Sequence, residues 1–212
     1  NPLGSLQLLR SQPQVLGLAA VVFISGFAQY AHPSVFVLYG DYRYGWGQKE
    51  VGYVLALVGA LAIVVNAVLV GVMVRRMGER RALLLSLACG AVGFTVSGLA
   101  PQGWLFLLGL PIAAIWGAAN PASQALITRQ VDPHLQGRTQ GALMSLVALA
   151  GVVGPAVYAG SFGWVVSEAS PLRLPGLPYL VSASMLALAV AIAWRHAHLA
   201  PTPAAAPAEA AR

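Results

Sequence analysis

Six long stretches of this sequence contain no Asp, Glu, Lys or Arg. An α-helix needs about 20 apolar residues to cross a bilayer, and each stretch is close to that length or longer. Every backbone N–H and C=O group must be paired inside lipid, so such stretches are predicted to form transmembrane helices. The six predicted spans are residues 14–39, 51–74, 82–100, 104–128, 140–166 and 177–194.

The composition agrees with a membrane protein. Of the 212 residues, 58% are hydrophobic and only 8% are charged, against roughly 25% charged in a typical soluble domain. This excludes a cytosolic enzyme, a disordered protein and a nucleic-acid-binding domain, because too few charges remain for a solvated surface. The net charge of +6 comes from short basic clusters between apolar runs, which is the membrane pattern.

The basic residues predict the orientation of the spans. The N-terminal segment, residues 75–81, residues 129–139 and the C-terminal segment hold nine of the twelve Lys and Arg. Basic connections stay in the cytoplasm, so both termini are expected there, at a cell inner (plasma) membrane. Residues 1–13 are expected to be an interfacial or cytoplasmic lead-in to a bundle over residues 14–195. The Pro/Ala-rich residues 196–212 are expected to be a disordered tail.

The six spans are predicted to form two triplets, which gives an all-α integral membrane bundle built as a 3+3 inverted repeat. The first span of each triplet has a polar cluster beside a proline, at Pro33 in one and Pro121 in the other. These two spans cross the bilayer in opposite directions. Paired, proline-interrupted spans are typical of inverted-repeat transporters and of their binding sites.

Polar side chains recur at helical spacing on these spans, at intervals of three and four residues, and span two adds one amide near mid-membrane. A buried amide is costly in lipid unless it meets a partner or water, so we interpret the set as the wall of a cavity. Hydrogen bonding between helices is the alternative interpretation, and for His32 a structural role is favoured over proton transfer. The candidate substrate-binding residues are Gln29, His32, Asn66, Trp116, Asn120 and Gln124.

Four residues are predicted to bend helices. A proline inside a span frees a backbone carbonyl and permits a bend, and a neighbouring glycine adds freedom. The predicted bend residues are Pro33, Pro121, Gly154 and Pro155. Small residues along spans three and five, such as Gly93, predict close approach of helix backbones.

The connection between spans two and three reads GVMVRRMGERR. Its Gly78 predicts a tight reversal of the chain. Its arginines are expected to pair with lipid phosphate, with Glu79 or with helix C-termini at a cytoplasmic gate; simple positive-inside anchoring is the alternative. The candidate gating residues are Gly71, Arg75, Arg76, Gly78, Arg80 and Arg81.

This loop resembles the G-x-L-x-D-R-x-G-R-R motif of the major facilitator superfamily, in the weaker copy found in the C-terminal half. Residues 128–141, TRQVDPHLQGRTQG, resemble the loop between helices ten and eleven of that superfamily. More narrowly, four strings resemble the TCR/Tet tetracycline-resistance efflux pumps. They are the opening NPL, GDYRYGW, GERRALL and QGRTQGAL.

The resemblance implies helices seven to twelve of a twelve-helix drug/proton antiporter. The N-terminal six-helix half, with the acidic residues of proton coupling, is then expected before Asn1, where the sequence opens without Met. Spans one, two, four and five are implied to face a central cavity, and the drug to leave as a chelate with a divalent cation such as Mg²⁺. The implied partners are the drug, the bilayer, protons and the other half. No enzymatic activity, protein-bound cofactor, metal site or nucleic-acid partner is expected.

Other functions stay open on the residues alone. The chain could be a degenerate or non-transporting six-helix membrane protein, or a transporter of this superfamily for a different solute. An intramembrane serine protease is disfavoured because the string at Ser161 has the wrong order. A voltage-gated channel is disfavoured because no span carries an arginine ladder. His196 and His198 are interpreted as interfacial residues rather than metal ligands.

Overall fold

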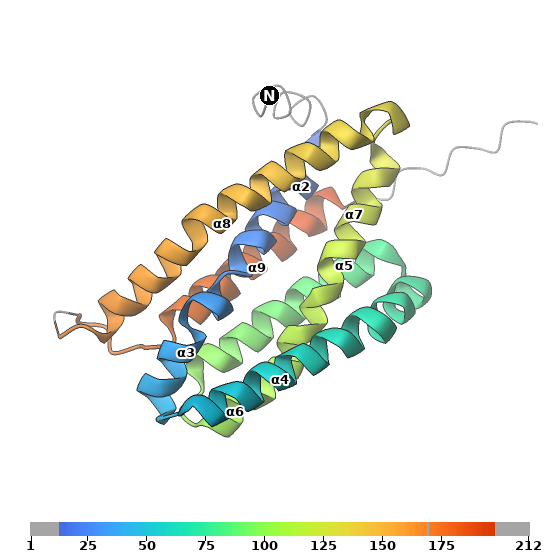
Figure 1. Cartoon of the computed structure of the whole chain (residues 1–212). Coiled ribbons are helices and arrows are strands. Elements are labelled where there is room, and N and C mark those ends of the chain that lie inside the picture. The colour runs from blue at the N-terminus through green and yellow to red at the C-terminus, as the bar shows by residue number, and fades with distance from the viewer. Residues whose placement is uncertain (1–12, 169, 198–212) are drawn as a thin grey trace, which may run out of the picture.

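The computed structural model describes residues 13–168 and 170–197. Within them the chain is almost entirely helical and contains no strand. The first half consists of α2 (Pro13–Ala28), α3 (Ala31–Tyr44), α4 (Gln48–Val64), the π-helical segment η1 (Val65–Leu69) and α5 (Val70–Leu99). The second half consists of α6 (Gly103–Ala114), the 3₁₀ segment η2 (Ile115–Ala118), α7 (Ala119–Gln130), the 3₁₀ segment η3 (Pro133–Leu135), α8 (Gln136–Val166) and α9 (Leu177–His196). These helices form one elongated bundle (Figure 1).

Five continuous helical segments of the described chain are long and apolar enough to cross a membrane. They cover Val15–Tyr44, Gln48–Leu99, Gly103–Gln130, Pro133–Val166 and Leu177–His196. The second segment contains both predicted spans two and three, which accounts for five segments where the sequence analysis gives six. The predicted arrangement as two inverted triplets stays a prediction.

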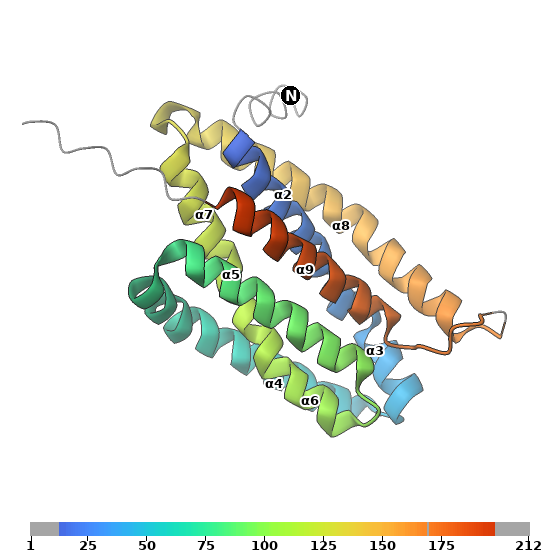
Figure 2. The same cartoon turned by 180° about the vertical axis from the view of Figure 1, so that it is seen from behind.

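The chain reverses inside that 52-residue segment at Gly78. This residue has φ 77° and ψ 166°, outside the helical region, so α5 consists of two arms rather than one rod. A positive φ is favourable for glycine because it has no Cβ. Figures 1 and 2 show the chain turning back here at one end of the bundle. The tight reversal predicted at Gly78 is therefore confirmed.

Two predicted boundaries differ most from the structure. Span one is predicted to end at residue 39, but α3 continues to Tyr44, and Asp41 and Arg43 are exposed on its last turn. The helix ends where Gly45 takes the left-handed conformation, at φ 66°. The loop predicted over residues 75–81 is helical on both sides of Gly78, because arginine, methionine and glutamate favour helix.

Small residues set the closest helix contacts, as predicted for span three. Gly93 of α5 lies so close to α6 that a Cβ on it would overlap the backbone of Ala113. On the facing helix, a Cβ on Gly109 would meet Ser97 and the carbonyl oxygen of Gly93. Such contacts let the α5 and α6 backbones pack closely, which replaces the hydrophobic driving force that lipid does not supply.

Seven aromatic side chains fill one end of the bundle, around Phe106, which is fully buried. The Phe106 ring centroid lies 5.6 to 6.4 Å from the centroids of six other rings. Tyr39 donates from its hydroxyl to the carbonyl oxygen of Ser97 at 3.1 Å, which ties α3 to α5. The aromatic cluster consists of His32, Phe36, Tyr39, Tyr44, Trp46, Phe106 and Tyr179.

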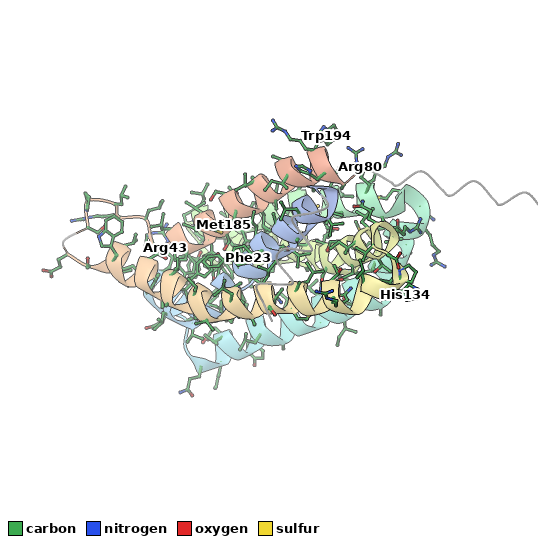
Figure 3. The ribbon with its side chains drawn as sticks, turned by 90° about the horizontal axis from the view of Figure 1, so that it is seen from above. Phe23, Arg43, Arg80, His134, Met185 and Trp194 are labelled. Carbon is green, nitrogen blue, oxygen red and sulfur yellow. The ribbon has the colours of Figure 1, made fainter. Side chains whose placement is uncertain are left out.

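Charged residues gather at the ends of the bundle. Figure 3 places Arg80, His134 and Trp194 toward one end and Arg43 toward the other. The lead-in predicted over residues 1–13 and the tail predicted over 196–212 fall almost wholly outside the described residues.

Candidate functional site

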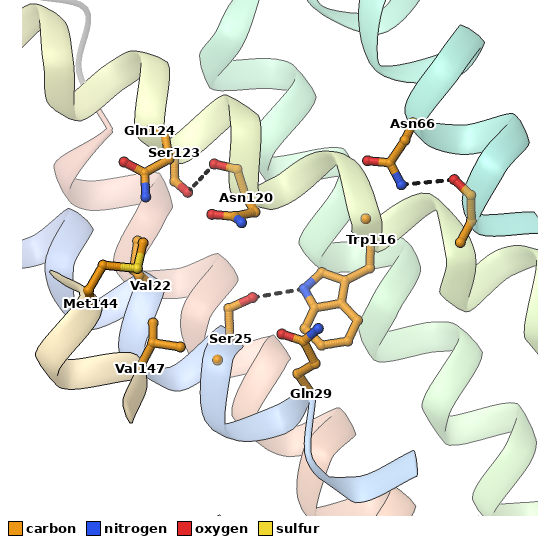
Figure 4. Close-up of a pocket in the computed structure, with 13 residues that line it drawn as sticks. Val22, Ser25, Gln29, Asn66, Trp116, Asn120, Ser123, Gln124, Met144 and Val147 are labelled. Carbon is orange, nitrogen blue, oxygen red and sulfur yellow. Dashed lines mark hydrogen bonds between the residues drawn. The ribbon is translucent and has the colours of Figure 1, made fainter. Parts of the chain in front are cut away.

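A cavity of about 540 Å³ opens between the helices. Its walls come from α2, from α4 and η1, from η2 and α7, and from α8, which are the predicted spans one, two, four and five (Figure 4). These are the four spans that the resemblance assigns to a central cavity. The described lining residues are Val22, Ser25, Gly26, Gln29, Ala62, Asn66, Trp116, Gly117, Asn120, Ser123, Gln124, Met144 and Val147.

Gln29 reaches the cavity from a break between α2 and α3. Pro33 has no N–H to donate to the carbonyl of Gln29 four residues earlier, and its ring crowds that carbonyl. The helix accordingly stops at Ala28 and restarts at Ala31, and the Tyr30 N–H donates to the carbonyl oxygen of Phe27 at 3.1 Å. The interruption predicted at Pro33 thus lies one turn before the proline.

Trp116 lies on a second irregular segment with the same origin. Pro121 removes the hydrogen bond that would reach the carbonyl of Gly117, and the 3₁₀ segment η2 surrounds that residue. The Trp116 Nε1–H donates to Ser25 Oγ at 2.9 Å, which joins η2 to α2 across the cavity wall. The indole is therefore fixed by a hydrogen bond between two helices.

Asn66 lies in the π-helical segment η1. Its Nδ2 donates to the carbonyl oxygen of Ala62, one turn earlier in the chain, at 2.8 Å. Isolated π-helical turns are frequent at functional sites. This hydrogen bond stays within one helix, and the role predicted for Asn66 stays a prediction.

Gln124 joins α7 to α8. Its Oε1 accepts a hydrogen bond from Gln140 Nε2 at 2.7 Å. One turn earlier, Asn120 is exposed to the cavity. None of the described lining residues is charged, so this part of the site offers amides, two hydroxyls, an indole and apolar surface.

His32 is the one predicted binding residue that lies outside the described lining of the cavity. Its ring stacks on Phe36 with centroids 4.6 Å apart and lies 6.2 Å from that of Tyr179, within the aromatic cluster. The shared face predicted for Gln29 and His32 assumes an unbroken helix, and the break at Tyr30 separates them. The structural role favoured for His32 agrees with this position.

The third predicted bend leaves its helix unbroken. α8 runs through Gly154 and Pro155 as one helix from Gln136 to Val166. Its glycines instead make room for Tyr30: a Cβ on Gly151 would lie 2.7 Å from the Tyr30 hydroxyl oxygen, and one on Gly154 would lie 3.0 Å from the Tyr30 Cβ. The break in α2–α3 is thus held against α8.

The charged side chains of residues 75–81 make contacts with several different helices. Glu79, which is nearly buried, pairs with Arg129 of α7 at 2.7 Å rather than with a loop arginine. Arg80 donates to the carbonyl oxygen of Trp194 at 3.0 Å and lies 5.3 Å from its ring centroid, near the C-terminal end of α9. Arg75 donates to the carbonyl oxygen of Gly71 in its own helix at 3.1 Å.

The sequence analysis does not include every residue that lines or supports the cavity. Met144 and Val147 of α8 reach the cavity, but apolar residues look alike on lipid-facing and cavity-facing sides of a span. Ser123 lies beside the predicted Asn120 and Gln124 and could have been included on spacing alone. Gln140 supports Gln124 from outside the described lining.

The chain matches the model of the Major Facilitator Superfamily over residues 1–155 and belongs to that family. It is therefore related to membrane transporters and not to enzymes. This agrees with the resemblance drawn from the loop motifs.

Tetracycline resistance proteins are among its relatives. The chain is 32% identical to the class C protein of Escherichia coli over 190 residues, which is 85% of this chain and 48% of the relative. It is 36% identical to the class G protein of Vibrio anguillarum over 184 residues, 82% of this chain and 47% of the relative. It is also 26% identical to human hippocampus abundant transcript-like protein 1 over 91% of this chain. The chain spans about half the length of the relatives it matches.

Proposed function

We propose that this chain is the C-terminal half, helices seven to twelve, of a proton-coupled drug efflux antiporter of the tetracycline type. It spans a cell inner membrane six times as a 3+3 inverted repeat, with both termini in the cytoplasm. The excess of arginine on one set of connections supports the orientation. The similarity to tetracycline resistance proteins supports the substrate.

The observation that carries the proposal is the amide-lined cavity between four spans. Polar groups inside a membrane protein are expensive unless they meet partners or a solute, and here several amides and an indole face one space of about 540 Å³. Its size lies in the range of small-molecule sites. Irregular helix segments at Gln29 and Trp116 line it, as in transporters whose broken helices form the site.

The proposed substrate is tetracycline as its chelate with Mg²⁺, the ion being cargo rather than a resident cofactor. Trp116 offers a flat apolar face, and the amides of Gln29, Asn66, Asn120 and Gln124 offer hydrogen bonds to the oxygens of the drug. The absence of charge among the described lining residues suits the partly neutralised chelate.

The proposed mechanism is alternating access, in which this bundle rocks against an N-terminal bundle with the drug held between them. None of the six predicted spans contains a carboxylate, so the proton-carrying groups are assigned to the other half. This chain alone is then unable to couple efflux to a proton gradient.

The proposal is tested with the intact gene product reconstituted in liposomes. We expect uptake of labelled tetracycline when a proton gradient and Mg²⁺ are present, and none from this chain alone. Uptake of other solutes but not tetracycline would point to a different substrate. Failure of the intact protein to transport or bind any drug of a broad panel would favour a non-transporting membrane protein, and coupled uptake by this chain alone would overturn the half-transporter assignment.

A further inference from the structure

The hydrogen bond between Gln124 and Gln140 has a direction. Gln140 Nε2 donates and Gln124 Oε1 accepts, with 2.7 Å between the two atoms. A glutamine amide has one acceptor oxygen and one donor nitrogen on opposite sides. With its oxygen held toward α8, Gln124 keeps its Nε2 for other partners on the cavity side.

Gln140 acts from behind the wall of the cavity. It is absent from the described lining of the large cavity and lines a separate space of about 40 Å³ with Thr128, Gln136 and three other residues. Within the described chain, the side chain of Gln140 forms a hydrogen bond only with Gln124. An effect of Gln140 on a bound molecule in the large cavity would therefore pass through Gln124.

Two other polar hydrogens of the wall, those of Trp116 and Ser123, are already used. The Trp116 Nε1–H donates to Ser25 Oγ, and the Ser123 hydroxyl donates to the carbonyl oxygen of Asn120 at 2.9 Å (Figure 4). Trp116 thus presents its ring face rather than its N–H. At this end of the cavity the Nε2 of Gln124 is a donor whose direction is set by a second residue.

We infer that Gln140 is a positioning residue that makes Gln124 a hydrogen-bond donor, so that the cavity selects solutes presenting a carbonyl or enol oxygen toward α7. The inference rests on the proposed function and specifies its substrate chemistry. A solute presenting only N–H groups or apolar surface at this point would leave the Gln124 N–H without an acceptor, which is costly in a desolvated site.

The test is a double-mutant cycle on the dissociation constant of tetracycline with Mg²⁺, measured on the intact transporter. The variants are Gln140→Leu, Gln124→Leu and the double substitution. Gln136→Leu is the matched control, since Gln136 lies one turn before Gln140 on α8 and donates to Thr128 rather than to a residue of the large cavity. Thermal unfolding of each variant is measured in parallel.

We expect Gln140→Leu to weaken binding about tenfold in the native background. In the Gln124→Leu background the same substitution is expected to cause no further loss, and Gln136→Leu to leave the dissociation constant unchanged. A merely structural role would instead lower the unfolding midpoint and weaken binding equally in both backgrounds.

Two results overturn the inference alone: unchanged affinity in Gln140→Leu, or an equal loss in both backgrounds while the native protein binds tetracycline. If the native protein binds no tetracycline, the proposed substrate fails and the inference fails with it. The two failures are therefore distinguishable by the native protein.

Discussion

The cavity and the aromatic cluster meet where α2 is followed by α3, yet they are built in opposite ways. Gln29 faces the cavity, whereas His32, three residues later, stacks on Phe36 in the cluster. In an unbroken helix the two side chains would share a face. The break that Pro33 causes at Tyr30 lets one short polar segment both line the cavity and pack in the aromatic cluster.

The two regions contribute different properties to the bundle: the cluster contributes stability, and the cavity wall contributes exposed polar groups. The rings of the cluster pack against one another, and Phe106 and Tyr179 are fully buried. The cavity wall keeps amides exposed to an open volume, as Asn120 does. Substitutions in the cluster are therefore expected to change the free energy of unfolding, and those in the wall to change affinity.

The largest effect is expected for Phe106→Ala. It removes the central ring of the aromatic cluster, and the loss of a buried phenylalanine typically costs about 3–5 kcal/mol. Thermal unfolding in detergent should show a much lower midpoint. Tetracycline affinity of the fraction that stays folded should be close to native. A loss of affinity without a loss of stability would contradict the separation of the cluster from the cavity.

Gly93→Ala is expected to destabilise next most strongly. The new Cβ would overlap the backbone of Ala113, so α5 and α6 must separate, at a cost of about 1–3 kcal/mol. Gly59→Ala is the control, because a Cβ on Gly59 has no neighbour within 4 Å in the described chain. Equal unfolding midpoints for the two variants would contradict the close α5–α6 contact.

Asn120→Leu is expected to act on affinity rather than on stability. It removes an amide that faces the cavity, and loss of one hydrogen bond to a ligand is worth about tenfold in the dissociation constant. Equilibrium binding and thermal unfolding separate the two effects. Leu108→Ala, at an exposed residue of α6 outside the described lining, should leave affinity unchanged.

The smallest effect is expected for His32→Phe. A ring of similar volume replaces one that stacks on Phe36, and volume-conserving exchanges usually cost less than about 1.5 kcal/mol. Binding and proton-driven transport should both be close to native. If the variant binds tetracycline normally but loses proton-driven transport, His32 takes part in proton transfer, and its assignment to a purely structural role is wrong.

Much of the architecture follows from the sequence. Uncharged stretches of helical length locate the spans, because the bilayer fixes how many apolar residues a crossing needs. Polar residues beside Pro33 and Pro121 locate the irregular segments, since a missing N–H has a local effect. Five of the six residues predicted for the site, all except His32, line the cavity; whether they bind a substrate stays a prediction.

The rest depends on contacts between helices. Gln29 and His32 point in different directions because the helix breaks one turn before Pro33. The position of this break cannot be predicted from the proline alone, since Tyr30 at the break also packs against Gly151 and Gly154 of α8. The partner of Glu79 is Arg129, fifty residues later in the chain. Spacing along the sequence does not predict which distant residues form such ion pairs. It also does not predict which apolar residues of α8 face the cavity.

The most direct test of the central claim, that the cavity between these four spans holds the substrate, is substrate protection of single cysteines in the intact transporter. Cys89, the one cysteine of this sequence, and any cysteine elsewhere in the protein are first replaced by serine. Cysteines are then introduced by Asn120→Cys and Met144→Cys in the wall and by Arg138→Cys outside it. We predict that tetracycline with Mg²⁺ slows alkylation at the two wall positions and not at position 138, whereas equal rates with and without the drug at all three positions would contradict the account.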